Sequence, residues 1–157
     1  MKKFLLFALF AVCISAFAQA QTKEKVAVYV TGNVSSTYKK IISSKAVSRI
    51  SRSDSYVAVE RTDAFLKALS KEQDYQLSGE VRDDQIAELG VRFGVRYVAV
   101  FDVTQTHDMG FVSARMIDVE TGMVIKSADS NRTINSSEDW VAIVNNVAFR
   151  LVSKNSK

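Results

Sequence analysis

The sequence predicts an α/β domain built on a mixed sheet of about five strands with helices on both faces. In the first half of the chain, short β-branched and aromatic runs alternate with helical patterns, which favours parallel strands joined by crossovers. In the second half such runs are joined by tight turns, which favours hairpins. Residues 96–104 are apolar on both alternating faces, as in a central strand covered on both sides. The expected order is strand, helix, strand, two helices, three strands and a final helix.

The first strand and helix are indicated by turn and capping residues. Residues 25–31 read KVAVYVT and are followed by Gly32 and Asn33, a turn signal. Ser35 or Ser36 can accept a hydrogen bond from the free amides of a following helix. Apolar residues then recur every four positions along a line that we expect to face the sheet: Ile42, Ala46 and Ile50.

A second strand over residues 56–59 precedes two more predicted helices. Thr62 is expected to cap the first of these helices, and Asp83 to start the second. The residues expected to face the core are Phe65, Leu66, Leu69, Ile86, Leu89 and Phe93. Gly94 is placed where a helix end takes a left-handed residue, and Gly90 indicates close packing.

Two further strands, over residues 111–119 and 123–128, are predicted to continue as a meander. The short joint between them ends in Gly122, which is typical of a hairpin loop whose last residue has positive φ. Residues 135–139 form a capping cluster for the final helix. The apolar residues that this helix is expected to bury are Trp140, Ile143, Val144, Val147 and Leu151.

Residues 1–20 have the three regions of a secretory signal peptide. Two lysines are followed by an apolar run over residues 4–17 and by the small-residue sequence AQA. The run is shorter than the stretch of about 20 residues that a membrane-spanning helix needs. We therefore expect cleavage after residue 20, with residues 21–157 forming one exported domain.

Composition argues against several kinds of chemistry. The one cysteine, Cys13, lies inside the predicted signal peptide, so we expect no disulfide and no thiolate ligand or nucleophile in the exported part. The one histidine is His107, and a zinc site without a second histidine or a cysteine is unusual. Loss of two lysines with the signal peptide lowers the net charge from +4 to +2, which does not indicate a nucleic-acid partner. We expect no cofactor, no metal and no integral membrane segment after cleavage.

Several motifs resemble, in order and spacing, those of the CsgG/LpoB-type envelope domain, with similarity also to the amino-terminal domain of TolB and to FlgT. The resemblance covers roughly residues 25–128. The resemblance rests on a strand ending in arginine, a Gln-x-Ser-Gly connector, a helix ending in glycines and an Arg-x-x-Asp-x-x-Thr-Gly hairpin. They fall on Arg61, Gln76, Ser78, Gly79, Asp83, Gly90, Gly94, Tyr97, Arg115, Asp118, Thr121 and Gly122.

The resemblance implies a non-catalytic α/β domain used in envelope assembly, either activating peptidoglycan synthases or forming part of a secretion apparatus. Two departures limit the transfer. Cys13 follows Val12 inside the apolar run and fits a lipid-attachment site poorly, and the short strand connections leave no room for pore-forming hairpins. A secretion channel is therefore disfavoured.

Two sets of residues are candidates for binding a partner. Lys45, Arg49 and Arg52 are spaced as a basic stripe along the first helix. This stripe is either a solvated helix flank or a contact for an anionic glycan, a lipid or an acidic protein.

The second set, His107, Asp108, Met109 and Phe111, belongs to the predicted loop over residues 105–111. Exposed methionine and aromatic side chains are common anchors of protein interfaces. The alternatives are a solvated His107 and a Phe111 that turns inward at the start of its strand.

The sequence favours a non-catalytic exported protein, periplasmic or peripheral to the outer membrane, that binds an envelope protein of unknown identity. A second hypothesis is a glycan hydrolase that uses paired carboxylates, either Asp83 with Asp84 or Asp118 with Glu120. Both pairs also fit purely structural roles, because carboxylates are favoured at helix starts and in turns. A third hypothesis is a module that binds a small ligand or a surface.

Overall fold

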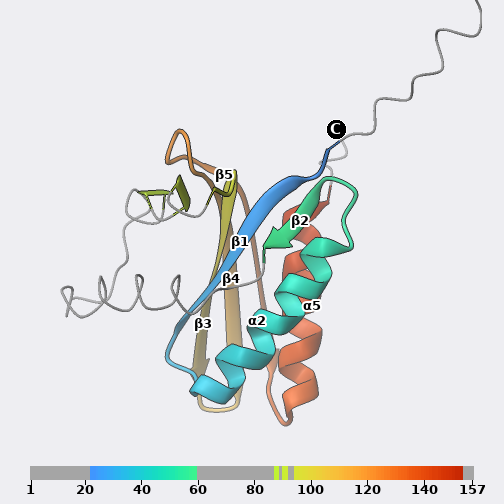
Figure 1. Ribbon diagram of the computed structural model, residues 1–157. Coiled ribbons are helices and arrows are strands. Elements are labelled where there is room, and N and C mark those ends of the chain that lie inside the picture. The colour runs from blue at the N-terminus through green and yellow to red at the C-terminus, as the bar shows by residue number, and fades with distance from the viewer. Residues whose placement is uncertain (1–21, 60–86, 89, 92–93, 154–157) are drawn as a thin grey trace, which may run out of the picture.

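The computed structural model describes residues 22–59, 87–88, 90–91 and 94–153, which form a five-stranded sheet with two long helices (Figure 1). The strands are β1 (Glu24–Gly32), β2 (Tyr56–Val59), β3 (Tyr97–Thr106), β4 (Met109–Asp118) and β5 (Val124–Thr133). The helices are α2 (Ser36–Ser51) and α5 (Ser137–Val152). The predicted α/β class with a mixed sheet is confirmed.

The sheet has the order β2-β1-β3-β4-β5, so β3 lies at its centre. β1 runs parallel to both β2 and β3, whereas β3, β4 and β5 form an antiparallel meander. The predicted crossovers in the first half and hairpins in the second half are therefore both present. Val98, Ala99, Val100 and Phe101 of β3 are buried, as expected for a strand covered on both faces.

The helices α2 and α5 lie side by side on one face of the sheet (Figure 1). The predicted line of α2, Ile42, Ala46 and Ile50, is fully buried against this face. All five apolar residues predicted to be buried in α5 are buried as well. The largest side chains of this core are Trp140, Phe101, Ile42, Ile50, Met116 and Leu151. Each such burial contributes about 1.5–3 kcal/mol of hydrophobic free energy.

A second, smaller core lies on the opposite face of the sheet. Its buried members are Ala27, Tyr29, Val95, Val98, Val100, Ile117 and Val119. Residues 87, 88, 90 and 91 are helical, and a Cβ added to Gly90 would lie 2.2 Å from Cγ2 of Val119. Gly90 therefore brings helical backbone against this core, as its predicted close packing requires, and Gly94 has the expected positive φ of 63°.

The strand boundaries differ most from the sequence expectation at the end of β5 and around the β3–β4 turn. β5 continues to Thr133 instead of ending at residue 128, and β4 begins at Met109 instead of residue 111. The extension of β5 is polar and lies at the sheet edge, where neither face demands apolar residues, so hydrophobic alternation could not indicate it. The predicted seven-residue loop is accordingly a turn of two residues, His107 and Asp108, between paired strands.

Some predicted features lie outside the described residues. These are the signal peptide, the helix after residue 61, the Gln-x-Ser-Gly connector, the Asp83-Asp84 pair and the core residues Ile86, Leu89 and Phe93. Among the residues that the structure describes, no helix is both long enough and apolar enough to cross a bilayer.

Candidate functional site

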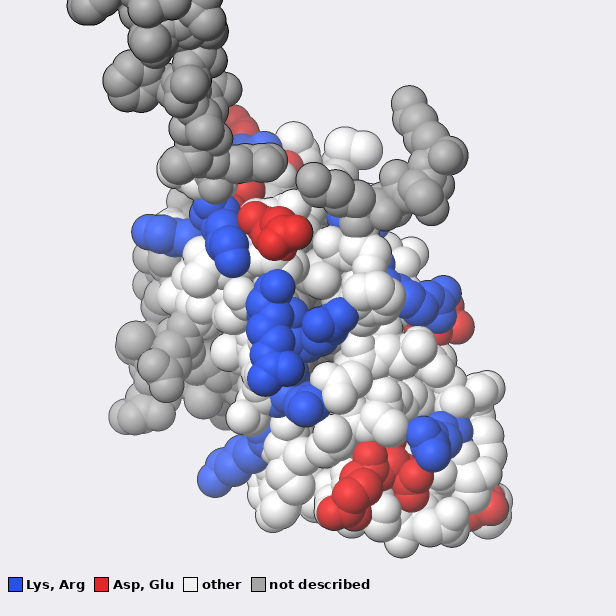
Figure 2. Space-filling model, turned by 90° about the vertical axis from the view of Figure 1, so that its right-hand side faces the viewer, with Lys and Arg blue, Asp and Glu red and all other residues white. Residues whose placement is uncertain are grey.

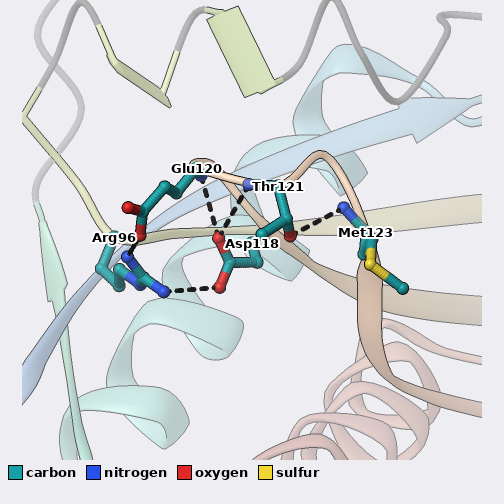
Figure 3. A network of polar contacts seen from close by, with 5 residues as sticks. All are labelled: Arg96, Asp118, Glu120, Thr121 and Met123. Carbon is teal, nitrogen blue, oxygen red and sulfur yellow. Dashed lines mark hydrogen bonds and ion pairs between the residues drawn. The ribbon is translucent and has the colours of Figure 1, made fainter.

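The carboxylate of Asp118 holds the turn between β4 and β5 (Figure 3). Its Oδ1 accepts hydrogen bonds from the backbone N–H groups of Glu120 at 2.9 Å and Thr121 at 3.2 Å. Its Oδ2 lies 2.8 Å from Nη2 of Arg96, which stands just before β3. Thr121 Oγ1 in turn accepts a hydrogen bond from the backbone N–H of Met123 at 3.3 Å. The Arg-x-x-Asp-x-x-Thr-Gly motif thus has a structural reason.

The same contacts test the hypothesis that Asp118 and Glu120 act as a catalytic acid/base pair. Asp118 is buried, and both of its carboxylate oxygens are engaged by turn amides or by Arg96. Glu120 forms its own ion pair with Nη1 of Arg96. Bonding to Glu120, with further support from Tyr97 and Asp118, raises the pKa of Arg96 above its ordinary value. The contacts therefore support the turn role of this pair.

The His107–Asp108 turn lies at the end of the sheet where β1 finishes. His107 is exposed and has a φ of 56°, which matches a tight two-residue hairpin. The backbone carbonyl of Asp108 accepts a hydrogen bond from Ile134 N–H at 2.6 Å. The side-chain Oδ1 of Asn33 accepts one from the Gln105 backbone at 2.8 Å. The turn is therefore tied to both neighbouring loops.

Met109 and Phe111 lie on β4 behind this turn, on the face of the sheet opposite α2 and α5. Phe111 is 42% exposed, so it does not turn into the core. Met109 is partly buried, and its Sδ lies 3.5 Å from the Thr133 hydroxyl that donates to it. Phe111 is paired with Thr104 on β3 and Asn131 on β5, so its apolar surface stands among polar neighbours.

The predicted basic stripe belongs to a groove between the carboxyl-terminal ends of α2 and α5. The groove has a volume of about 250 Å³. We call it the basic groove, and its lining residues are Arg49, Arg52, Ser53, Asp54, Ser55, Phe149, Val152 and Ser153. The structure thus brings Arg49 and Arg52 together with residues about one hundred positions later in the chain. Lys45 is partly buried on α2, one turn before Arg49, and does not line the groove.

Two features distinguish the arginines of the basic groove. The guanidinium carbon of Arg49 lies 4.6 Å from the ring centroid of Phe149, which is 50% exposed. Neither Arg49 nor Arg52 forms an ion pair with a carboxylate among the described residues. In contrast, Arg96 and Arg132 pair with carboxylates, whereas Arg150 donates to the backbone carbonyl of Asp129 at 2.6 Å.

The surface of the helical layer shows how this charge is distributed. Lysine and arginine side chains gather over its middle, and acidic side chains lie beyond them (Figure 2). The positive side chains on this face are therefore grouped and do not alternate evenly with acidic ones.

A lysine fixes one wall of the basic groove. Nζ of Lys126 on β5 donates a hydrogen bond to the backbone carbonyl of Ser153 at 3.0 Å, just past the end of α5. Burial lowers the pKa of Lys126, which also lies 5.6 Å from the ring centroid of Tyr56. This contact holds the end of α5 against the sheet, so the spacing between Phe149 and Arg49 is set by the fold.

The basic groove and the His107–Asp108 turn lie at opposite ends of the sheet. Tyr56, which follows the groove residues, pairs with Glu24 at the start of β1, whereas Val103 pairs with Gly32 at its end. The two candidate sets therefore cannot form one continuous site.

The chemistry available at the basic groove is binding. Within the described part of the chain, no group of three or more histidine, cysteine, aspartate or glutamate side chains could hold a metal ion. The groove offers two guanidinium groups, an aromatic face, hydroxyls and one carboxylate, Asp54. Such a set can recognise an anion beside an apolar group.

Phe149 was not predicted as a site residue. It lies in the final helix, next to the buried residues Val147, Ala148 and Leu151. The sequence feature that could have identified Phe149 is an aromatic residue outside the buried stripe of an amphipathic helix. Arg96 was also missed, because its partners Asp118 and Glu120 lie across a hairpin that only the fold brings close.

Solved structures with this architecture are known, although no family model matches the sequence and no curated protein matches it. PelC from Paraburkholderia phytofirmans, solved as a dodecamer, has a TM-score of 0.55 and 18% identity over 86% of this chain and 92% of its own. The C-terminal domain of LpoB from Salmonella enterica has a TM-score of 0.53 and 11% identity over 80% and 92% of the two chains. The chain has the LpoB fold. TolB from Acinetobacter baumannii has a TM-score of 0.52 and 17% identity over 87% of this chain and 30% of TolB.

The predicted resemblance to LpoB and TolB is thus confirmed at the level of the fold. Of the motif residues, Asp118 and Thr121 bond within the β4–β5 turn, Gly122 has positive φ there, and Gly90 packs closely against Val119. None of these motif residues lines the basic groove. The motif residues therefore do not account for the groove.

Proposed function

We propose that this chain is a non-catalytic, exported envelope protein that acts as an adaptor or regulator in envelope assembly by binding another protein. The observation that carries the proposal is the basic groove, which is lined by two arginines without carboxylate partners in the described residues and by the half-exposed ring of Phe149. Arginine and aromatic side chains are enriched where proteins bind each other. The LpoB fold supports a location in the cell envelope, because the group of domains that the sequence resembles is used in envelope assembly.

The alternative functions are less well supported by the described residues. A hydrolase would need free paired carboxylates, and those of Asp118 and Glu120 are bound to Arg96 and to turn amides. A small-ligand module would need a larger pocket, because drug-sized ligands occupy cavities of about 300–1,000 Å³. The basic groove is smaller, at about 250 Å³, and opens on the surface.

The test is in-cell crosslinking in the source organism, with the tagged full-length chain as bait. Recovery of one envelope protein at a constant ratio to the bait is expected from an adaptor. A Trp140→Ala variant, which removes the largest buried side chain, should lose this capture because its fold is disrupted. If no envelope protein is enriched over that variant, or if the purified chain cleaves peptidoglycan, the adaptor role is wrong.

A further inference from the structure

We infer that the basic groove takes an acidic peptide segment of a protein partner, with a carboxylate between Arg49 and Arg52 and an apolar side chain on Phe149. This inference rests on the proposed adaptor function and names the chemistry of the partner at one site. It follows from the charge of the basic groove, the exposure of Phe149 and the shape of the surface.

The charge of the basic groove favours an anion. Arg49 lies in the last turn of α2, Arg52 is the residue that caps this helix, and both line the groove, which places two cationic side chains at one hollow. Neither is neutralised by a described carboxylate, although Asp54 lines the same groove. Planar guanidinium groups bind carboxylates through two parallel hydrogen bonds, which gives a directional contact.

The apolar part of the basic groove favours a ligand with a side chain beside its charge. Phe149 is 50% exposed, whereas most apolar residues of α5 are buried. Arg49 already covers part of its ring, which leaves the remaining face next to Val152 and Ser153. A peptide with an aliphatic or aromatic residue near its carboxylate would bury this face.

The shape of the surface favours a peptide over a membrane. The arginines and Phe149 line a hollow, and a flat lipid surface cannot reach into it. Asp54 also lines the groove, and it would repel a continuous layer of phosphates more than one carboxylate held at the arginines. A narrow segment that brings a single carboxylate to the arginines therefore fits the groove better than a membrane surface does.

The experiment selects peptides from a random displayed library on the purified exported protein. Recovered peptides are expected to contain aspartate or glutamate next to leucine, isoleucine or phenylalanine. Charge reversal with R49E and R52E together should weaken their binding about tenfold or more, and raised salt should weaken it too. Phe149→Ala should also reduce affinity, whereas the Arg49→Lys and Arg52→Lys pair should lose less than the charge reversal because it keeps both charges.

The matched control is Lys39→Glu with Lys40→Glu, which makes the same charge change at the other end of α2. It should leave peptide affinity unchanged, and circular dichroism should show that each variant is folded. Recovery of no acidic peptides, or equal binding to the R49E and R52E variant, would overturn the inference. Groove-dependent binding to phosphatidylglycerol vesicles without any acidic peptide would overturn it in favour of a lipid.

The two proposals fail separately. If crosslinking in cells captures an envelope protein equally well with the R49E and R52E variant, the adaptor role stands and the groove assignment is wrong. If acidic peptides bind the groove but no envelope protein is captured in cells, the groove assignment stands and the envelope role is wrong.

Discussion

Asp118 shows how one buried side chain can hold together three parts of the chain. Its carboxylate joins the end of β4, the following turn and Arg96 at the start of β3. A buried carboxylate is tolerated only when its oxygens are bonded, and here both are. Arg96 is also the partner of Glu120, so the turn is closed from both sides.

We predict that Asp118→Ala lowers the free energy of unfolding by about 2–3 kcal/mol, because it leaves Arg96 and two turn amides without their acceptor. Glu120→Gln is the control, since the Glu120 side chain is 71% exposed, and it should cost less than about 0.5 kcal/mol. Urea unfolding followed by circular dichroism measures both values. Equal stability of the two variants would contradict the assignment of Asp118.

Residue-level prediction from the sequence succeeded where a role depends on local chain geometry. The positive φ of Gly122 and the capping by Ser35, which accepts a hydrogen bond from Tyr38 N–H at 3.3 Å, were both predicted. Asp118 was predicted as a turn residue for the same reason. Arg96 and Phe149 were missed as partners, because the residues that they contact are distant in the sequence.

At the scale of the elements, α5 depends on its first turn. The Oδ2 of Asp139 accepts hydrogen bonds from the backbone N–H groups of Asn135 at 3.0 Å and Ser136 at 3.1 Å. Arg132 Nε lies 3.1 Å from its other oxygen. These bonds, the one from Asn135 first, lower the pKa of Asp139 below its ordinary value. The predicted capping cluster is therefore present, with Ser136 as the cap.

This lowered pKa predicts a pH dependence of stability. Asp139 becomes protonated near pH 3.9 in the unfolded chain, whereas its pKa is lower in the folded chain. The ionised carboxylate therefore stabilises the folded chain above about pH 4, and this stabilisation is lost as the pH falls below that. The difference in urea midpoint between the native chain and Asp139→Asn should therefore shrink between about pH 5 and pH 2.5. A difference that stays constant over this range would show that ionised Asp139 adds nothing to the helix start.

Element prediction worked best for buried segments. The helices α2 and α5 and the strands β1 and β3 carry apolar patterns that only one arrangement can bury. β5 was predicted too short, because the residues after Ala128, DSNRT, lack an apolar alternation and begin with Asp, Ser and Asn, which are residue types typical of turns. Pairing with β4, rather than burial, decides where that edge strand stops.

At the scale of the whole molecule, the sheet has a protected centre and two unequal edges. β3 is paired on both sides and buried on both faces, whereas β2 and β5 each pair with one strand among residues 22–59 and 94–153. We predict by hydrogen exchange with mass spectrometry that amides of β3 exchange slowest and those of β5 exchange faster. Protection of β5 equal to that of β3 would instead indicate that its outer edge is covered in solution.

The architecture was predictable as a whole, but the basic groove was not. Apolar patterning predicts which segments must be buried, and strand order follows from crossovers and short turns. The groove depends on how far α2 and α5 extend along the same face, which no local pattern encodes. The arginines on α2 were predicted as a candidate surface, and the fold added the aromatic residue opposite them.

The two walls of the basic groove come from residues 49–55 and residues 149–153, so neither segment can make the groove alone. Only a chain that has completed its fold, with its last helix docked, presents the groove to a partner. A partner that binds the groove would thus select the folded protein over an incompletely folded one. A partner held there would also delay thermal unfolding, by an amount that grows with its concentration.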